Sequence, residues 1–265
     1  MSKNLIINAD DYGITSEVSR GIRLAYTSGV LTSTTVMAIG LSCEEDLQLL
    51  QKECPAMGVG VHLTLTTFKP ISKINEVASL INDKGNFYRL NELKTAVQNI
   101  SPEELYNEWV LQVDKIISFG LNIDHLDSHH NAAYLSTTTF EVFKAIAKQF
   151  SLPVRLPMSP VGNLALETSA KASLDAAAVK SPDQLNFDFA EAADKRASLV
   201  NLLEKLNPGT TEVLCHPGFI DKELRSISSL LEPRQLEIEA LCAPEIRQVI
   251  QKQQIELTTY GRLFK

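Results

Sequence analysis

The stretch NLIINADDYG, residues 4–13, decides the fold class of this chain. Its apolar run from Leu5 to Ile7 leads directly into two adjacent aspartates, Asp10 and Asp11, and a helical pattern follows near residues 17–28. A short apolar strand, a polar turn and an amphipathic helix are the opening of a βαβ unit. We therefore predict that this stretch forms the first strand of a parallel sheet and that both carboxylates lie at its carboxyl end.

Short apolar segments alternate with longer amphipathic segments along the rest of the chain. The predicted further strands are residues 32–38, 57–65, 122–126, 154–156, 211–215 and 256–259. The predicted further helices are residues 44–52, 101–118, 138–149 and 191–206, with another that starts near residue 244. About six to eight strands that alternate with helices predict an α/β protein, an irregular (β/α) barrel of the TIM type with parallel strands. An open doubly wound sheet is the alternative.

The 265 residues are predicted to form one catalytic barrel domain, 1–265, because this length suffices for a single α/β barrel. Two excursions interrupt the pattern, near residues 66–99 and 159–190. The first contains Pro70 and a turn over residues 83–86, and the second is rich in alanine and serine. No internal repeat or low-complexity linker divides the sequence.

Composition narrows the class of protein. Apolar residues make up 44% and charged residues 22%, which excludes a disordered or fibrous chain. The 32 acidic against 25 basic residues give a net charge of −7, which argues against a nucleic-acid partner. No apolar run is long enough for a membrane span, and the N-terminal stretch is not a signal peptide. Four scattered cysteines without CxxC spacing predict a reduced, cytoplasmic protein: Cys43, Cys54, Cys215 and Cys242.

The histidines gather at the ends of predicted strands. All five follow or end an apolar strand: His62, His125, His129, His130 and His216. The carboxyl ends of the strands in a parallel barrel open on one face, where active sites are built. We therefore expect these imidazoles and the Asp10–Asp11 pair to form the active site at this rim. A single histidine at such a position usually has a structural role, with its hydrogen bonds made within the protein. That explanation fits less well when polar residues gather at the ends of several strands.

Strand alternation groups three of these residues. If residues 122–129 stay extended, His125, Asp127 and His129 point to one side and His130 to the other. A histidine with a nearby carboxylate suits a metal ligand, because the carboxylate fixes the imidazole tautomer. The residues alone do not distinguish His125 from His129 as the ligand. A polar loop with solvated histidines is the competing interpretation.

Asp10 and Asp11 are adjacent, so their side chains diverge and can take different tasks. One carboxylate can bind a cation while the other stays close to the attacking water, which is a hydrolytic arrangement. A strand-end turn or a helix cap would also explain an aspartate pair.

Arg155, near another strand end, could contact substrate, orient a carboxylate or form a surface ion pair. Neither a phosphate-binding glycine loop nor a G-x-S-x-G elbow is present.

Five motifs together resemble the YdjC family of carbohydrate deacetylases, whose best-known class is the chitooligosaccharide deacetylases. In chain order they are Asn8-Ala9-Asp10-Asp11-Tyr12-Gly13, Leu31-Thr32-Ser33-Thr34-Thr35, Gly60-Val61-His62-Leu63, His125-Leu126-Asp127-Ser128-His129-His130 and Cys215-His216-Pro217-Gly218-Phe219. The resemblance implies an irregular (β/α) barrel with a metal motif similar to that of the polysaccharide deacetylases. Asn131 stands where the family often has a third histidine. This difference leaves the metal positions unchanged and affects the residues expected to contact substrate.

The resemblance also implies roles for individual residues. The implied metal ligands are Asp11, His62 and His125, the implied general base is Asp10, and the implied acid for the leaving amine is His216. His129, Asp127 and Arg155 are then expected as substrate contacts. The cofactor is one divalent ion, magnesium by resemblance, although two imidazoles favour zinc or another transition ion.

The expected activity belongs to carbohydrate metabolism: a metal-dependent hydrolase that acts on linear amide bonds. Its substrate would be a small acetylated amino sugar, such as diacetylchitobiose, another chitooligosaccharide or their phosphates, with acetate as a product. The resemblance also implies a homodimer. Two alternatives are a metal-dependent phosphoesterase that acts on a sugar phosphate and a non-catalytic sugar-binding or regulatory barrel. The sequence offers no second metal cluster, which argues against the phosphoesterase. It keeps every motif residue that a non-catalytic barrel would be expected to lose, which argues against the second alternative.

Overall fold

Strand β1 (Lys3–Tyr12) is the strand on which the sheet is built. In this computed structural model, which describes residues 2–158 and 164–264, β1 pairs in parallel with β2 (Ser33–Val36), β6 (Gly209–Cys215) and β7 (Ile255–Leu257). Every residue from Leu5 to Tyr12 is buried. A strand covered on both faces needs the nearly continuous apolar run that the sequence has there.

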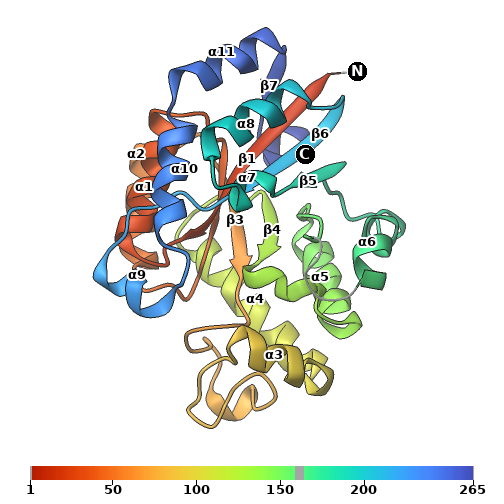
Figure 1. Cartoon of the computed structure of the whole chain (residues 1–265). Coiled ribbons are helices and arrows are strands. Elements are labelled where there is room, and N and C mark those ends of the chain that lie inside the picture. The colour runs from red at the N-terminus through yellow and green to blue at the C-terminus, as the bar shows by residue number, and fades with distance from the viewer. Residues whose placement is uncertain (1, 159–163, 265) are drawn as a thin grey trace. The chain divides into compact units, whose positions relative to one another are not determined.

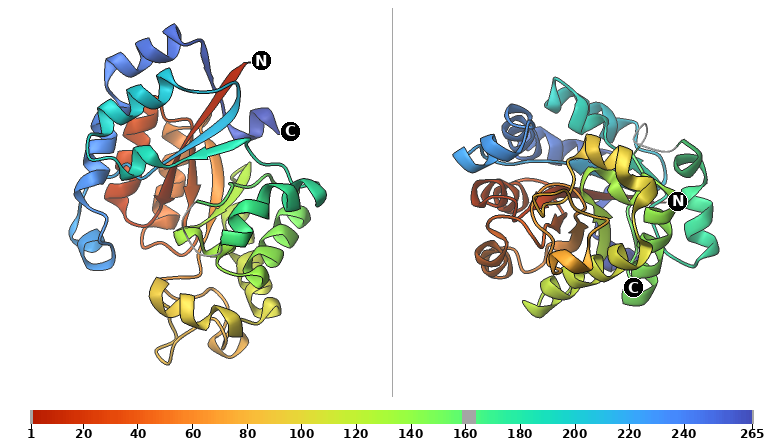
Figure 2. Two further views of the ribbon diagram at one scale, coloured as in Figure 1. Left: turned by 45° about the vertical axis from the view of Figure 1, so that its right-hand side comes forward. Right: turned by 90° about the horizontal axis from the view of Figure 1, so that it is seen from below.

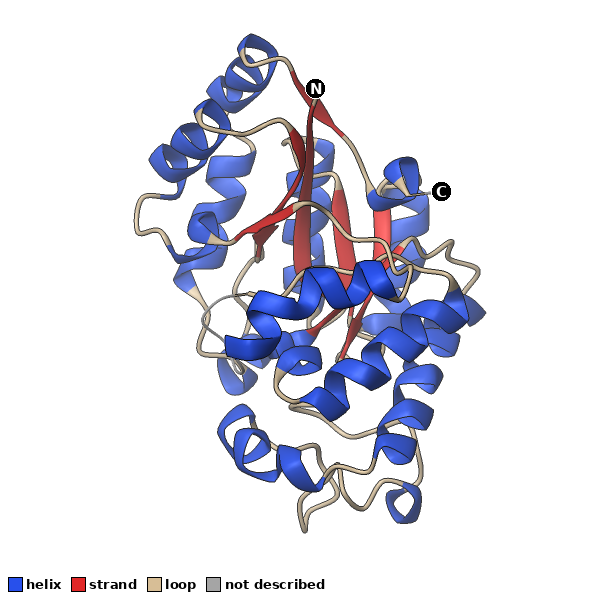
Figure 3. Cartoon of the chain, turned by 90° about the vertical axis from the view of Figure 1, so that its right-hand side faces the viewer, coloured by secondary structure: helices blue, strands red, loops and turns tan. Residues whose placement is uncertain are grey.

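The sheet has seven strands in the described part of the chain, in the order β4-β3-β2-β1-β6-β5, with β7 paired to β1. The remaining strands are β3 (Gly58–Leu63), β4 (His125–Ser128) and β5 (Gln184–Asn186). Figure 3 shows the strands in red and the helices that accompany them in blue. The predicted class, α/β with parallel strands in an irregular (β/α) barrel, is confirmed.

The chain divides into two compact units. Unit 1 comprises residues 1–36, 40–60 and 182–265, and unit 2 comprises residues 37–39 and 61–181. Strand β3 begins in unit 1 and ends in unit 2. The single catalytic domain 1–265 stays a prediction.

Unit 1 carries the helices that follow β1, β2, β5, β6 and β7. They are α1 (Ser16–Thr27), α2 (Cys43–Glu53), α7 (Asp188–Glu191), α8 (Lys195–Glu204), α9 (Lys222–Ile227), α10 (Glu232–Leu241), α11 (Pro244–Lys252) and α12 (Tyr260–Leu263). Helices α1 and α10 pack side by side (Figure 1). The Thr15 hydroxyl accepts from Val18 N–H and caps α1. Helices α9 and α10 and strand β5 were not predicted.

Unit 2 is organised around α4 (Pro102–Ser118) and α5 (Thr137–Phe150), which pack against each other (Figure 2). Helix α4 lies where the sequence predicted a helix, over residues 101–118. Ser101 caps it, and the chain turns after it at Gly120, with a φ of +76°. Trp109 and Phe143 meet edge to face in the core of this unit, with ring centroids 6.4 Å apart. The other elements of unit 2 are η1 (Ile74–Glu76), α3 (Leu90–Ala96), η2 (Val97–Asn99), η3 (His129–Tyr134) and α6 (Leu164–Ala176).

The first predicted excursion, residues 66–99, is tied to α4 by two glutamates. Glu108 is fully buried and accepts the backbone N–H groups of Ile71 and Ser72, while Glu104 accepts that of Ser79. The second excursion is described only in part, because residues 159–163 lie outside the described residues. The strand predicted at 154–156 is reduced to an isolated bridge between Leu126 and Val154. No helix among the described residues is long and apolar enough to span a membrane.

Gly40 lies where the chain passes against the turn after β1, and we expect Gly40→Ala to destabilise the protein. An added Cβ would lie 2.2 Å from the carbonyl oxygen of Gly13, which is backbone and cannot rotate away. Overpacking of this kind costs about 1–3 kcal/mol. Urea unfolding measures the loss, and Lys52→Ala, at an exposed position of α2, is the control. Equal stability of the two variants would contradict the close packing of Gly40 against the Gly13 carbonyl group.

Candidate active site

A β-bulge shapes the carboxyl end of β1. Ala9 pairs with Thr34 and Tyr12 pairs with Val36, so β1 has one residue more than β2 between these two pairs. The extra residue lies at Asp10–Asp11, and Asp11 has a left-handed φ of +70°. Bulges and positive φ at a non-glycine residue are costly, and they are typical of sites where a side chain is re-aimed for function.

The two aspartates have separate partners, as the sequence predicted. Asp10 Oδ1 accepts from Asn8 Nδ2 at 3.0 Å and from Thr35 Oγ1 at 3.4 Å. Asp11 Oδ2 accepts from Arg234 Nη2 at 2.6 Å. Both carboxyl groups are buried, with 3% of each residue exposed. The bulge therefore places the Asp10 carboxylate beside an amide and a hydroxyl group, and the Asp11 carboxylate beside a guanidinium.

His216 lies beside Asp10 because of strand register. Ala9 of β1 pairs with Cys215 at the end of β6, so the residues that follow each of them are neighbours. His216 Nε2 is 3.9 Å from Asp10 Oδ2, and about a quarter (23%) of the His216 side chain is exposed. The pair predicted as base and acid is thus close together within unit 1.

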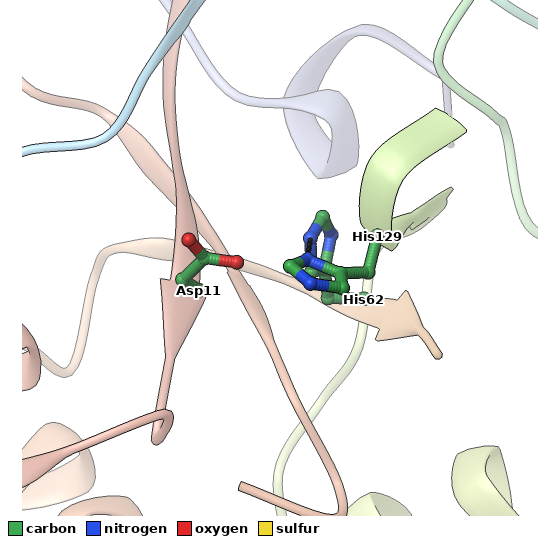
Figure 4. Close-up of side chains that lie close together, drawn as sticks. All are labelled: Asp11, His62 and His129. Carbon is green, nitrogen blue, oxygen red and sulfur yellow. Dashed lines mark hydrogen bonds between the residues drawn. The ribbon is translucent and has the colours of Figure 1, made fainter. Parts of the chain in front are cut away.

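His62, on β3 in unit 2, contacts Asp127 on β4 and His129, the first residue after that strand. Its Nδ1 lies 2.6 Å from Asp127 Oδ1, and its Nε2 lies 3.2 Å from His129 Nδ1. All three side chains are buried. Figure 4 shows the two imidazole rings together, drawn with Asp11 of unit 1.

Arg155 anchors this group through Asp127. Its Nη1 lies 2.7 Å from Asp127 Oδ2, and both side chains are buried. Burial raises the pKa of Asp127, but Arg155 and His62 outweigh it and lower the pKa to about 2. Asp127 is therefore an anion that accepts the Nδ1 proton of His62. Of the three roles that the sequence left open for Arg155, orientation of a carboxylate is the one this contact supports.

The backbone after β4 explains the place of His129. The extended chain ends at Ser128, and η3 begins with His129, followed by left-handed φ angles of +55° at His130 and Asn131. His130 Nδ1 is 2.8 Å from Thr66 Oγ1, and its ring stacks on that of His129 with centroids 3.8 Å apart. Left-handed φ angles are energetically costly at residues other than glycine. Two of them in succession set the direction in which the chain leaves His129.

His125 has a different surrounding. Its Nδ1 lies 2.6 Å from Asp124 Oδ1, and the residue is fully buried. Among the described residues, the groups of side chains that could hold a metal ion contain His62 with His129 or His62 with Asp127, and none contains His125. The geometry therefore favours His129 as the histidine that works with His62.

The donor set of this cluster fits a divalent metal ion. With its Nδ1 proton bound to Asp127, His62 presents the Nε2 lone pair toward His129 Nδ1. Carboxylate–histidine–metal arrangements have this form, because the carboxylate fixes the tautomer and raises the basicity of the ligand. The buried cluster of aspartate and histidine side chains can bind a metal ion.

Sequence comparison gives the family. A model of the YdjC-like protein family matches residues 4–252. This chain belongs to the YdjC-like family. The carbohydrate deacetylase of Thermoanaerobacter pseudethanolicus is 33% identical over 261 residues, which are 98% of this chain and 99% of that protein. The carbohydrate deacetylase of Enterococcus faecalis is 33% identical over 268 residues, 99% and 98% of the two chains.

Solved structures are similar to this YdjC-like chain in fold. A protein of Enterococcus faecalis V583, whose crystal structure is described as that of a cellobiose-phosphate cleavage protein, superposes with a TM-score of 0.91. It is 32% identical, and the match covers 100% of both chains. The Xyl-CE4 domain of a termite hindgut xylanase matches with a TM-score of 0.55 at 14% identity, covering 100% of this chain and 90% of the other. That second likeness shows a shared fold.

Two buried residues near this YdjC-like site were not predicted from the sequence. Arg234 and Glu237 contact Asp11 and the backbone of His216, and both lie on α10, a helix that the sequence did not predict. A charged residue at a buried helix position breaks the apolar period by which a helix is recognised. A search for charges spaced three apart after a proline could have found them.

We expect Arg155→Met to destabilise the protein by about 3–5 kcal/mol, because it leaves the buried Asp127 carboxylate without its cation. The double variant Arg155→Met/Asp127→Asn should lose clearly less, since the uncompensated charge is gone while His62 keeps an acceptor. Urea unfolding in the presence of a chelator measures both. Arg225→Met, at an exposed position of α9, is the control. Additive losses in the double variant would argue against a coupled pair.

Proposed function

We propose that this chain is a metal-dependent carbohydrate deacetylase, a hydrolase that cleaves the N-acetyl amide of a small acetylated amino sugar and releases acetate. The proposed substrates are diacetylchitobiose, other short chitooligosaccharides or their phosphates. The observation that carries the proposal is the buried pair of imidazole nitrogens, His62 Nε2 and His129 Nδ1, 3.2 Å apart with Asp127 behind His62. Relatives named carbohydrate deacetylases, 30–33% identical over nearly their whole length, support it.

The proposed metal ligands are His62 and His129, with Asp11 as the carboxylate. This set differs from the set implied by resemblance, Asp11, His62 and His125, because the nitrogen of His129 is the one near His62. When bound, a divalent ion would polarise the amide carbonyl and acidify the attacking water. Imidazole ligands suit zinc or another transition ion, while the family resemblance favours magnesium.

In this proposal Asp10 is the general base. Its carboxylate is buried and accepts from Asn8 and Thr35, whereas the Asp11 carboxylate accepts from Arg234. His216, 3.9 Å away, donates a proton to the amine when the carbon–nitrogen bond breaks. We also expect a cytoplasmic enzyme that forms a homodimer.

The function is tested by acetate release from diacetylchitobiose, with and without a chelator. We expect release that the chelator abolishes and that an added divalent ion restores. The description of the Enterococcus faecalis structure favours one competing activity, the cleavage of a phosphorylated disaccharide. Phosphorylated chitobiose is therefore assayed in parallel for acetate, for phosphate and for monosaccharides. Phosphate or monosaccharide without acetate would replace the deacetylase proposal.

Asp10→Asn should lower kcat by about two to four orders of magnitude, because a lost general base typically costs that much. Metal content, measured by atomic emission, should stay at the wild-type level, since Asp10 is not a proposed ligand. Asp188→Asn, at an exposed position of α7, is the control. Loss of the metal together with activity would make Asp10 a ligand.

Metal affinity distinguishes His129 from His125 as the proposed ligand. His129→Ala should weaken zinc or magnesium binding by more than the roughly 10–100-fold that is typical of residues around the ligands. His125→Ala should keep an affinity close to that of the wild type, because His125 belongs to none of the side-chain groups in the described part of the chain that could hold a metal ion. Isothermal titration of the metal-free variants measures both. The reverse order would restore His125 to the ligand set.

A further inference from the structure

Helix α10 presents two buried charges, one turn apart, to the loop that carries His216. Arg234 and Glu237 are 2% and 0% exposed. Neither residue belongs to the base, the acid or the ligands proposed above. Buried charged residues stabilise a fold poorly compared with apolar ones, so their presence calls for a local reason.

Glu237 and Arg234 contact the backbone of His216 at both its polar groups. Glu237 Oε2 accepts the His216 N–H at 2.5 Å, and Arg234 Nη1 lies 3.5 Å from the His216 carbonyl oxygen. Farther along the loop, the Gly218 N–H donates to the carbonyl oxygen of Arg234 at 3.3 Å. The loop at the end of β6 is thus fastened to α10 at three points.

Lys195 on α8 supplies the countercharge for Glu237. Its ammonium lies 3.1 Å from Glu237 Oε1 and donates to the Phe189 carbonyl oxygen at 3.1 Å. Burial raises the pKa of Glu237 to about 7, although the hydrogen bond from the His216 N–H and the charge of Lys195 both act to lower it. The carboxylate is held from both sides, by a lysine on one oxygen and a peptide N–H on the other.

We propose that Glu237 is a positioning residue that fixes the peptide of His216 and thereby the place of its imidazole beside Asp10. This inference rests on the proposed function, in which His216 protonates the leaving amine. Proton transfer in an amide hydrolysis needs the acid within hydrogen-bond reach of the nitrogen, and a misplacement of about 1 Å costs up to about 100-fold in rate. Glu237 acts on this step through the backbone and contacts no reacting atom.

Two double variants isolate the hydrogen bond from the ion pair. Lys195→Met/Glu237→Leu removes both charges and the acceptor of the His216 N–H. Lys195→Met/Glu237→Gln removes the same charges but keeps an amide oxygen that can accept it. Replacement of both partners of a buried pair is often close to neutral for stability, so both proteins are expected to fold. Glu239→Gln, at an exposed position of α10, is the control.

The kinetic readout compares an acetylated amine with an activated acetate ester, whose leaving group departs without a proton. His216→Ala should slow amide cleavage far more than ester cleavage, which defines the signature of a lost acid. The leucine variant should show the same signature, with kcat for the amide lowered about 10- to 100-fold. The glutamine variant should recover most of this loss. Equal amide rates of the leucine and glutamine variants would overturn the positioning role, as would equal losses on amide and ester.

A second readout does not depend on activity. In protein labelled with ¹⁵N at its five histidines, the His216 amide is assigned by its disappearance in His216→Gln. Its proton resonance should move upfield in the leucine variant and exchange with solvent faster, and both changes should be smaller in the glutamine variant. An unchanged His216 resonance in the leucine variant would overturn the proposal. Failure of the proposed function is distinguishable, because wild-type protein would then release no acetate while the His216 amide still responded to Glu237.

Discussion

The pairing of β1 with β6 is the constraint on which the proposed catalytic pair of unit 1, Asp10 and His216, depends. Parallel register matches Ala9 with Cys215, so the next residues, Asp10 and His216, become neighbours although they are far apart in the sequence. A shift of one residue would reverse the direction of every side chain on β6. The register is held by apolar side chains buried along both strands, so the packing of the core sets the distance between the proposed base and acid.

Buried charges in each unit are compensated by a partner from another segment of the chain. Arg234 of α10 pairs with Asp11 of β1, Lys195 of α8 pairs with Glu237 of α10, and Arg155 pairs with Asp127 of β4. A lone buried charge would be too costly, so each pair ties two elements together. These ties give the carboxylates different surroundings, and different surroundings allow different chemistry at neighbouring residues.

Much of the fold was predictable because local patterns report burial and backbone preference. The apolar run of β1 and the Ser101 cap of α4 were recognisable by residue type alone. Helix α10 was missed because its buried positions include Arg234 and Glu237, which the apolar period does not count. His129 could not be distinguished from His125, since the alternation rule holds only while the chain is extended, and the chain turns at His129.

The sequence by itself determined the α/β class, the alternation of strands with helices, the residue types of the site and their positions at strand ends. The tertiary structure alone decided which of those residues meet: His62 with His129 and Asp127, Asp11 with Arg234, and the His216 peptide with Glu237. The physical reason is the range of the interactions. Propensity and periodicity act over a few residues, whereas a contact between residues 11 and 234 depends on the packing of every element that positions them.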